Sequence, residues 1–330
     1  MRAVICRAWG GPETLTVEET AAPEPAADEI TIAVRAASVN FADTLMIQGS
    51  YQTRPDFPFS PGLECAGVVE RCGSGVTRFK PGDRVMAMLN YGGFAEVARA
   101  RETETFALPE EMDFDTGGSL LIANVSSHAA IRWQANLQAG ETMLVLGASG
   151  GTGLTAVEIG KALGARVIAA ASSDEKVALA RDHGADAGIN YATQSLKDEA
   201  LALTGGEGVN VCFDPVSGKL FDPALSAVGW GGRYLVFGFA GGIPDIPANR
   251  LLVKHRSAMG SSLRYFRHHA PDKLLQSVEE LTRWYGEGKI TSLVSKCYPL
   301  EAFAQALNDL TDRRATGRVV INPWSRAGAP

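Results

Sequence analysis

A glycine-rich segment at 147–153 is the part of this sequence best suited to bind a charged ligand. It reads Gly-Ala-Ser-Gly-Gly-Thr-Gly, follows an apolar run at 142–147 and precedes a helical pattern at 154–163. Glycines allow a tight turn and let backbone N–H groups approach a pyrophosphate at the positive end of a helix. A ligand-free turn is the alternative, but the strand and helix around the loop favour a dinucleotide site. The predicted cofactor-binding residues here are Gly147, Ser149, Gly150, Gly151, Thr152 and Gly153.

The tip of the next predicted strand indicates which nicotinamide cofactor is bound. An NAD site normally places Asp or Glu there to bind the ribose 2′-hydroxyl. This chain has Ala171 and Ser172 at that position, with Lys176 following. Because hydroxyls and a lysine suit a 2′-phosphate, we predict that Ser172, Ser173 and Lys176 bind NADPH. Alternatively, Ser172 and Glu175 form a capping box with Lys176 on the surface, and both interpretations can hold together.

Two different sequence patterns predict two kinds of domain. Before residue 116, short apolar runs between Pro and Gly residues predict a β-rich unit, with a half-buried strand at 29–36. A long helical segment is expected at 116–138. Alternating strand and helix patterns follow it and predict a parallel, doubly wound sheet. The expected strands are 142–147, 165–171, 188–191, 209–214, 233–238 and 317–321, and the expected helices are 154–163, 174–183, 271–287 and 300–311.

Composition excludes several classes of protein. The chain has 330 residues, which corresponds to about two domains. Its 31 Lys and Arg against 37 Asp and Glu argue against a nucleic-acid or anionic-membrane binder. No apolar run is long enough for a transmembrane helix, and the start of the chain lacks a secretory signal pattern. The five cysteines include no CxxC pair, so we expect neither a disulfide framework nor a zinc knuckle, and a cytoplasmic location.

Further segments carry a family resemblance. They read Asn-Phe-Ala-Asp at 40–43, Gly-Ser-Tyr at 49–51 and Pro-Phe-Ser-Pro-Gly-Leu-Glu-Cys-Ala-Gly-Val-Val at 58–69. The other matching segments are the glycine loop and the runs at 81–85, 172–176, 236–240 and 314–320. In this order the chain resembles medium-chain dehydrogenases/reductases of the NADPH:quinone oxidoreductase branch. The resemblance implies an α/β protein with a GroES-like catalytic domain at 1–120, a Rossmann NADP-binding domain at 121–262, and a return to the catalytic domain at 263–330.

Departures from zinc-dependent relatives bear on the chemistry. Those relatives carry a histidine where this chain has Leu63, a cysteine near Asn40, and a four-cysteine lobe that is missing here. Zinc needs three or four ligands close together, so we expect no metal site. Without that Lewis acid, the resemblance implies hydride transfer from NADPH to a quinone, or to the β-carbon of an α,β-unsaturated carbonyl.

The resemblance also assigns roles near the nicotinamide to Asn40, Asp43 and Tyr51. Asn40 would hold the cofactor ribose or amide, and Asp43 would orient Asn40 or Tyr51. Tyr51 would donate a hydrogen bond to a carbonyl oxygen, or a proton by way of water. Their structural alternatives are a turn residue, a first-turn helix acid and an amphipathic loop aromatic.

Other expected cofactor contacts also come from the resemblance. They are Ser126, with Ser127 beside it, Tyr191, Phe237, Gly238, Phe239 and Arg314, for which Arg313 and Arg318 are alternatives. Glu64 lies in an apolar run and should be paired inside the fold. Cys65 is expected to be a buried thiol rather than a nucleophile.

These observations together predict a zinc-independent, NADPH-dependent reductase of a quinone, enone or enal, which forms a homodimer. One alternative is an enoyl-CoA or acrylyl-CoA reductase on the same scaffold. Cations at 254–269 would favour it if they line a substrate mouth, whereas such a run is ordinarily a solvated face. The other alternative is a non-catalytic NADPH-binding protein. A zinc alcohol dehydrogenase fits the sequence less well.

Overall fold

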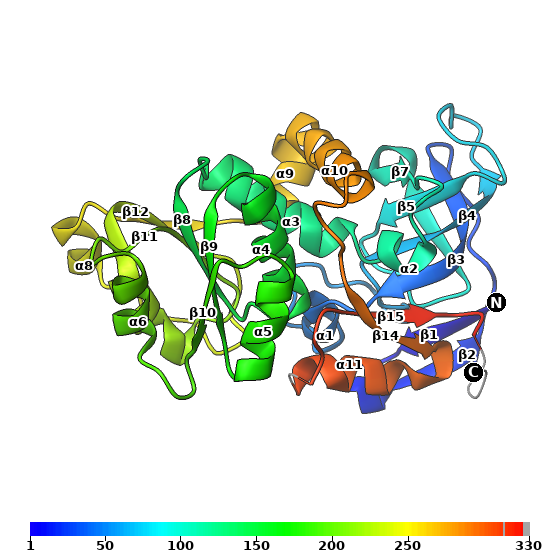
Figure 1. The fold of residues 1–330 in the computed structure, drawn as a ribbon. Helices are drawn as coiled ribbons and strands as arrows, with labels where there is room; N and C mark the ends of the chain where they lie inside the picture. Colours follow the sequence, from blue (N-terminus) through cyan, green and yellow to red (C-terminus); the bar gives the residue numbers. More distant parts are fainter. Residues whose placement is uncertain (313, 326–330) are drawn as a thin grey trace. The chain divides into compact units, whose positions relative to one another are not determined.

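The computed structural model describes residues 1–312 and 314–325, and the chain forms two compact units (Figure 1). Unit 1 comprises Met1–Ile122 together with the chain from Ser292 on. Unit 2 is the inserted segment Ala123–Thr291. In the described residues, no helix is long and apolar enough to cross a membrane.

Unit 2 is built on a parallel sheet, as its sequence pattern predicts. All of its residues are described, and the sheet has six strands in the order β10-β9-β8-β11-β12-β13. The strands are β8 (Thr142–Leu146), β9 (Arg166–Ala171), β10 (Ala187–Asn190), β11 (Val209–Asp214), β12 (Val228–Val236) and β13 (Ser257–Gly260). The chain order reverses between β8 and β11, so ligands of such a sheet bind beyond the carboxyl ends of these two strands.

Helices cover both faces of this sheet, with α4 and α5 on one face and α6 on the other (Figure 1). The helices are α3 (Ser126–His128), α4 (Gly151–Ala162), α5 (Asp174–Asp182), α6 (Leu196–Leu203), α7 (Phe221–Ala227), α8 (Ala248–Val253), α9 (Leu263–His269) and α10 (Pro271–Gly286). A 3-10 turn lies at Gly218–Leu220. Strand residues such as Leu144, Val145 and Ile168 are fully buried because helices cover both faces.

The helix expected at 116–138 is not continuous. The helix α2 (Phe114–Gly117) ends early, and π-helical turns at Leu121–Val125 and Ala129–Gln134 flank the short α3. The segment also crosses the boundary between the units at residue 122. Its first turn packs with unit 1 and the rest with unit 2, so a single regular α-helix is not formed.

Unit 1 contains an extended, mostly antiparallel sheet. In its described part the strand order is β14-β15-β3-β4-β5-β7, with β6 also paired to β3. These strands are β3 (Glu29–Ser38), β4 (Glu64–Cys72), β5 (Arg84–Met88), β6 (Val97–Arg101), β7 (Thr105–Ala107), β14 (Val294–Pro299) and β15 (Arg318–Asn322). A separate pair is formed by β1 (Arg2–Cys6) and β2 (Leu15–Glu19), and the helices besides α2 are α1 (Phe41–Ile47) and α11 (Phe303–Thr311). The described residues of this unit also form 3-10 turns at Pro12–Thr14, Glu102–Glu104 and Leu300–Ala302.

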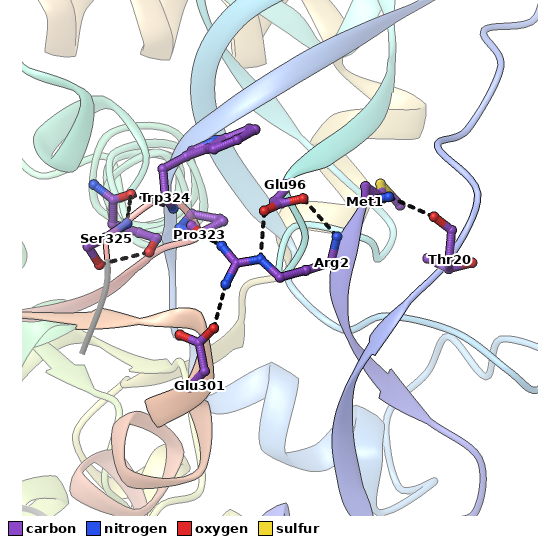
Figure 2. A network of polar contacts seen from close by, with 9 residues as sticks. Met1, Arg2, Thr20, Glu96, Glu301, Pro323, Trp324 and Ser325 are labelled. Atoms are coloured by element: carbon purple, nitrogen blue, oxygen red, sulfur yellow. Dashed lines mark hydrogen bonds and ion pairs between the residues drawn. The ribbon is translucent and has the colours of Figure 1, made fainter.

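Both ends of the chain close unit 1, and Arg2 joins them. Its Nε donates to Glu96 Oε1 at 2.7 Å, and its other guanidinium nitrogens reach Glu301 Oε1 at 2.5 Å and the Pro323 carbonyl at 2.7 Å (Figure 2). The Arg2 side chain therefore links Glu96, the residue before β6, with the C-terminal part of the unit. In the sheet, β15 pairs antiparallel with β3 and completes this closure.

The return to unit 1 comes at residue 292, later than the boundary at 263 that the resemblance implies. The helix α10 belongs to unit 2 because it buries apolar side chains there and hydrogen bonds to the segment before β8. Its Ser277 Oγ accepts from Trp133 Nε1 at 3.0 Å and lies 2.9 Å from His128 Nδ1. The buried apolar residues of α10 are Leu274, Val278, Leu281 and Trp284. A helical pattern alone does not reveal which unit its apolar face meets.

Candidate functional site

The glycine loop forms the tight strand-to-helix turn that the sequence predicts. After β8, the Gly150 N–H donates to the Gly147 carbonyl at 3.1 Å, and α4 begins at Gly151. A Cβ on Gly153 would lie 2.1 Å from Gly147 O, so only glycine fits there. Ser149 is buried within the loop and Thr152 lies in the first turn of α4. The N-terminus of a 12-residue helix thus lies directly beyond the carboxyl end of β8.

A hydroxyl and an ammonium group meet at the tip of β9. Ser173, and not Ser172, caps α5, because its Oγ accepts from the Lys176 N–H at 3.3 Å. The suggested capping box of Ser172 with Glu175 is therefore wrong. Ser172 is exposed, and Lys176 Nζ donates to its Oγ at 3.4 Å. The capping role falls on the neighbouring serine, which leaves the Ser172 hydroxyl and the Lys176 charge together at the tip.

The acids near this tip have partners of their own. Asp174 Oδ1 accepts from Asn190 Nδ2 at 2.8 Å. A hydrogen bond from Ser173 lowers the pKa of the Glu175 carboxyl. The Tyr191 N–H donates to the Ala171 carbonyl at 3.0 Å, which places partly buried Tyr191 beside the end of β9. The hydrogen bond from Asn190 therefore holds Asp174 beside the end of β10.

Asp214, at the end of β11, is a site residue that sequence reasoning missed. It is fully buried, and its Oδ1 accepts from the N–H groups of Val216 at 2.8 Å and Ser217 at 2.6 Å. Its Oδ2 accepts from Ser217 Oγ at 3.0 Å and from the Tyr234 hydroxyl at 2.5 Å. Ser217 has a φ of 57°, a strained conformation that this network holds in place. An acid at the end of an apolar strand, followed by Pro-Val-Ser-Gly, was the available signal.

The same aspartate fixes the loop after β12. Its backbone carbonyl accepts from the Phe237 N–H at 2.9 Å and the Gly238 N–H at 3.1 Å. The Phe237 ring lies 4.6 Å from that of Phe213, while Phe239 is 45% exposed. Strands of a parallel sheet end at the same edge, so these loops follow the edge that begins with the glycine loop. We call this carboxyl edge of unit 2 the glycine edge.

Ser126 and Ser127, proposed from the sequence as neighbours of this edge, begin α3. Ser126 is partly buried and Ser127 is fully buried. A cofactor contact of Ser126 stays a prediction.

A second polar cluster lies in unit 1 and joins Asn40 to Glu64. Asn40 immediately precedes α1, and its Nδ2 donates to Glu64 Oε1 at 2.9 Å. The Ile122 N–H donates to Glu64 Oε2 at 2.8 Å. Glu64 is fully buried, and burial raises its pKa, while the hydrogen bond from Asn40 and the charge of Arg318 oppose that shift. The expected pairing of Glu64 inside the fold is confirmed.

Asp43 holds the backbone around this cluster. It is fully buried, its Oδ2 accepts from the Asn40 N–H at 2.8 Å, and its Oδ1 accepts from the Gly62 N–H at 3.1 Å. Burial raises its pKa to about 7, and Glu64 adds to that effect. Gly62 has a φ of 105°, and a Cβ there would lie 2.7 Å from Phe94 N. Asp43 therefore orients Asn40 and the turn before β4, and a role of Asp43 near the nicotinamide stays a prediction.

The burial of two further residues of unit 1, Tyr51 and Cys65, bears on their expected roles. Tyr51 is partly buried and packs against the hydrophobic core. Cys65 is fully buried and burial raises its pKa to about 12, so the expected burial of this thiol is confirmed.

The expected cofactor arginine is engaged within its own unit. Arg314 Nε lies 3.1 Å from Asp309 Oδ1, and another guanidinium nitrogen lies 2.9 Å from Asp312 Oδ2. Arg318 is buried near Glu64, and Arg313 lies outside the described residues. A cofactor contact of Arg314 stays a prediction.

The cationic run at 254–269 has mixed roles. Arg256 donates to the backbone carbonyl of Val228 and is thus structural, while Arg264, His268 and His269 are exposed. In the part of the chain that the structure describes, no three His, Cys, Asp or Glu side chains gather into a set that could hold a metal ion.

A β-rich unit built from both chain ends, with an inserted doubly wound domain that carries a glycine loop, defines a medium-chain dehydrogenase/reductase. Residues 26–110 match the family model for the alcohol dehydrogenase GroES-like domain, and residues 151–280 match that for zinc-binding dehydrogenase. Quinone oxidoreductase-like protein 2 of Rattus norvegicus is 36% identical over 323 residues, which cover 97% of this chain and 92% of the relative. Quinone oxidoreductase of the same organism is 33% identical over 312 residues, 94% of each chain.

Solved structures agree with these relatives. The crystal structure of Escherichia coli quinone oxidoreductase complexed with NADPH has a TM-score of 0.92 at 28% identity, and covers 98% of this chain and 100% of that chain. This chain therefore belongs to the quinone oxidoreductase family of medium-chain dehydrogenases/reductases, which are oxidoreductases.

Proposed function

We propose that this protein is a zinc-independent reductase that uses NADPH to reduce a quinone, an enone or an enal. The observation that carries the cofactor choice is the pair of Ser172 and Lys176 at the tip of β9, where an NAD enzyme has an acid. A 2′-phosphate would accept from both groups, and α4 would offer its N-terminal N–H groups to the pyrophosphate. Several structural relatives, including the Escherichia coli enzyme, are described as complexes with NADPH.

Zinc independence rests on the residue types in unit 1. Asn40 stands where zinc-dependent relatives carry a cysteine, and its amide nitrogen is engaged by Glu64. Leu63 stands where they carry a histidine, and a buried aliphatic side chain offers no lone pair to a metal. The chemistry must therefore suit an acceptor that is already electrophilic. Bound NADPH supplies the hydride; Tyr51 would donate a hydrogen bond to the acceptor's carbonyl oxygen, and Asn40 would hold the ligand.

The test is turnover by the purified protein, followed as loss of NADPH absorbance with a naphthoquinone, a 2-alkenal and a short enoyl-CoA. Turnover with the quinone or alkenal, unchanged by a zinc chelator, is the expected result. Preference for the enoyl-CoA would shift the assignment to an acyl-CoA substrate. Tight NADPH binding without turnover of any acceptor would contradict the enzyme assignment.

Lys176→Ala tests the cofactor choice directly. We expect the KM for NADPH to rise about 10-fold, because a charge-assisted hydrogen bond to the 2′-phosphate is lost. The KM for NADH should not change, since NADH lacks that phosphate. Lys197→Ala, which removes an exposed lysine from α6 of the same unit, is the matched control. Equal effects of Lys176→Ala on both cofactors would contradict the assignment.

We also propose a homodimer that pairs unit 2 through β13. This strand lies at the end of the six-stranded sheet, beyond β12. Large apolar side chains near this edge are exposed, with Trp230 at 70%, Leu252 at 82% and Val253 at 67%. An open strand edge beside apolar surface pairs readily with a second copy.

Leu252→Glu tests the dimer. The side chain is 82% exposed, so the fold should tolerate the change, while a charge on the pairing surface should weaken association about 10-fold or more. Analytical ultracentrifugation over a concentration series measures the dissociation constant. Lys197→Glu, on exposed α6 surface, serves as a control for added negative charge. An unchanged dissociation constant for Leu252→Glu would place the interface elsewhere.

A further inference from the structure

The hydrogen bond between Asn40 and Glu64 also fixes which end of the Asn40 amide faces Glu64. Both carboxylate oxygens of Glu64 accept, one from Asn40 Nδ2 at 2.9 Å and the other from the Ile122 N–H at 2.8 Å. An ionised carboxylate has no hydrogen to donate, so it can meet only the nitrogen end of the Asn40 amide. Arg318, which is 5% exposed, provides a nearby positive charge that favours the ionised form.

The opposite end of the amide is consequently an acceptor that points away from Glu64, toward the start of α1, where the Asn40 side chain accepts from the Asp43 N–H in a capping box. An amide oxygen has two lone pairs, so it can accept a second hydrogen bond from a ligand. Asn40 is partly exposed, whereas Glu64 and Asp43 behind it are fully buried. Asp43 holds the Asn40 backbone N–H at 2.8 Å, so two buried carboxylates hold this residue at its main chain and at its side chain. Such support leaves the amide oxygen little freedom before a ligand arrives.

We propose that Glu64 is a positioning residue that selects the amide orientation of Asn40, so that Oδ1 accepts from an N–H or O–H group of the bound ligand. The proposal rests on the proposed function, because the carboxamide and ribose hydroxyls of NADPH are donors of this kind. The nearly isosteric Glu64→Gln change inverts the amide. The Ile122 N–H requires the oxygen of the introduced glutamine amide, and the nitrogen of that amide then donates toward Asn40. Asn40 must therefore turn its own oxygen inward.

A double-mutant cycle distinguishes positioning from mere structural support. Glu64→Gln should weaken NADPH binding about 3- to 10-fold, the effect of one lost hydrogen bond. In the Asn40→Ala background the same change should add nothing, because no amide remains to orient. Equal costs in both backgrounds would overturn the proposal. Glu110→Gln, which alters an exposed glutamate, is the control for loss of one negative charge.

Exchange of the pair gives a rescue. In Asn40→Asp with Glu64→Gln, the nitrogen of the introduced glutamine donates to the introduced aspartate, while the glutamine oxygen still accepts from the Ile122 N–H. A carboxylate oxygen, which is an acceptor, then again points outward. This double variant should bind NADPH better than Asn40→Asp alone, in which two carboxylates face each other. Thermal unfolding should first show that both variants are folded. If they are and the double variant binds NADPH no better than Asn40→Asp, the proposal is contradicted.

A readout without ligand separates this inference from the proposed function. The Asn40 side-chain NH₂ should be protected from hydrogen exchange in the wild-type protein and lose that protection in Glu64→Gln, as followed by ¹⁵N-edited NMR. If the amide inverts as expected but the wild-type protein does not bind NADPH, the proposed function fails while the orienting role of Glu64 stands. If NADPH binds and the amide protection is unchanged in Glu64→Gln, only the orienting role fails.

Discussion

The glycine edge of unit 2 and the cluster of Asn40, Asp43 and Glu64 in unit 1, which we call the acid cluster, fix the positions of their polar groups in different ways. At the glycine edge, a single turn arranges the backbone N–H groups of one short run, 147–153, which we propose as binding groups. In the acid cluster, Glu64 meets partners 24 and 58 residues away in sequence. The first site is a local conformation, and the second exists only once distant segments have folded together.

The two regions also differ in how they satisfy buried carboxylates. Asp214 receives all of its described side-chain hydrogen bonds from within 20 residues, three of them from the turn that follows it. Asp43 instead lies close enough to Glu64 for the charge of Glu64 to raise the pKa of Asp43 further above its ordinary value. The glycine edge therefore carries its acid as a loop anchor, whereas the acid cluster carries coupled charges in a low-dielectric core.

The largest expected effect comes from the glycine loop. Gly153→Ala should reduce NADPH affinity about 100-fold or more, because the new Cβ would lie 2.1 Å from Gly147 O and must displace the turn. Gly150→Ala is the matched comparison, since its Cβ would lie 3.6 Å from the same oxygen. It should leave the thermal transition unchanged and cost about 10-fold in affinity, through hindered approach of the pyrophosphate. Equal binding losses in the two variants would show that the turn itself is not the determinant.

Asp214→Asn should have the next largest effect. The amide replaces one accepting oxygen with a donor while four donors still face it, so the free energy of unfolding should fall by about 3 kcal/mol. Because the Asp214 loop holds Phe237 and Gly238, the KM for NADPH should rise as well. Urea denaturation and steady-state kinetics measure the two effects. Tyr234→Phe removes a single donor and should cost about 1 kcal/mol, and an equal cost for both variants would contradict this account.

Asp43→Asn should have a smaller and pH-dependent effect in the acid cluster. We expect a loss of about 1–3 kcal/mol, because the new amide faces the N–H groups of Asn40 and Gly62. The pKa of Asp43 is raised to about 7 from 3.8, so between these values the folded chain keeps a proton that the unfolded chain releases. The stability that Asp43 contributes is therefore present at low pH and decreases as pH rises to about 7.

Denaturation of both proteins at pH 5 and pH 8 measures this dependence. The stability difference between wild type and Asp43→Asn should be smaller at pH 8 than at pH 5. A difference that stays constant with pH would show that Asp43 is ionised at both pH values, and a difference that grows toward pH 8 would contradict a raised pKa of Asp43.

Individual segments show how much of the fold the sequence predicted. The strands at 142–147 and 209–214 and the loop between β8 and α4 form nearly where the pattern placed them, because apolar runs and glycines act over a few residues. Ser172 was correctly placed at a strand tip, but the cap fell to Ser173, a difference of one residue that depends on the exact end of β9. The helix at 116–138 was wrong in its continuity, because the boundary between the units lies inside it.

The sequence by itself determined the inserted α/β plan, the glycine loop and the choice of polar residues at 40, 43 and 64, since these follow from periodicity, backbone freedom and resemblance. Only the tertiary structure decided that Glu64 pairs with Asn40, that Asp43 is a buried support, that Asp214 anchors a loop, and that α10 belongs to unit 2. The physical reason is the separation in sequence between the residues that interact. Turns and caps depend on neighbours in the chain, whereas burial, pKa and hydrogen-bond partners depend on what distant strands and helices bring into contact.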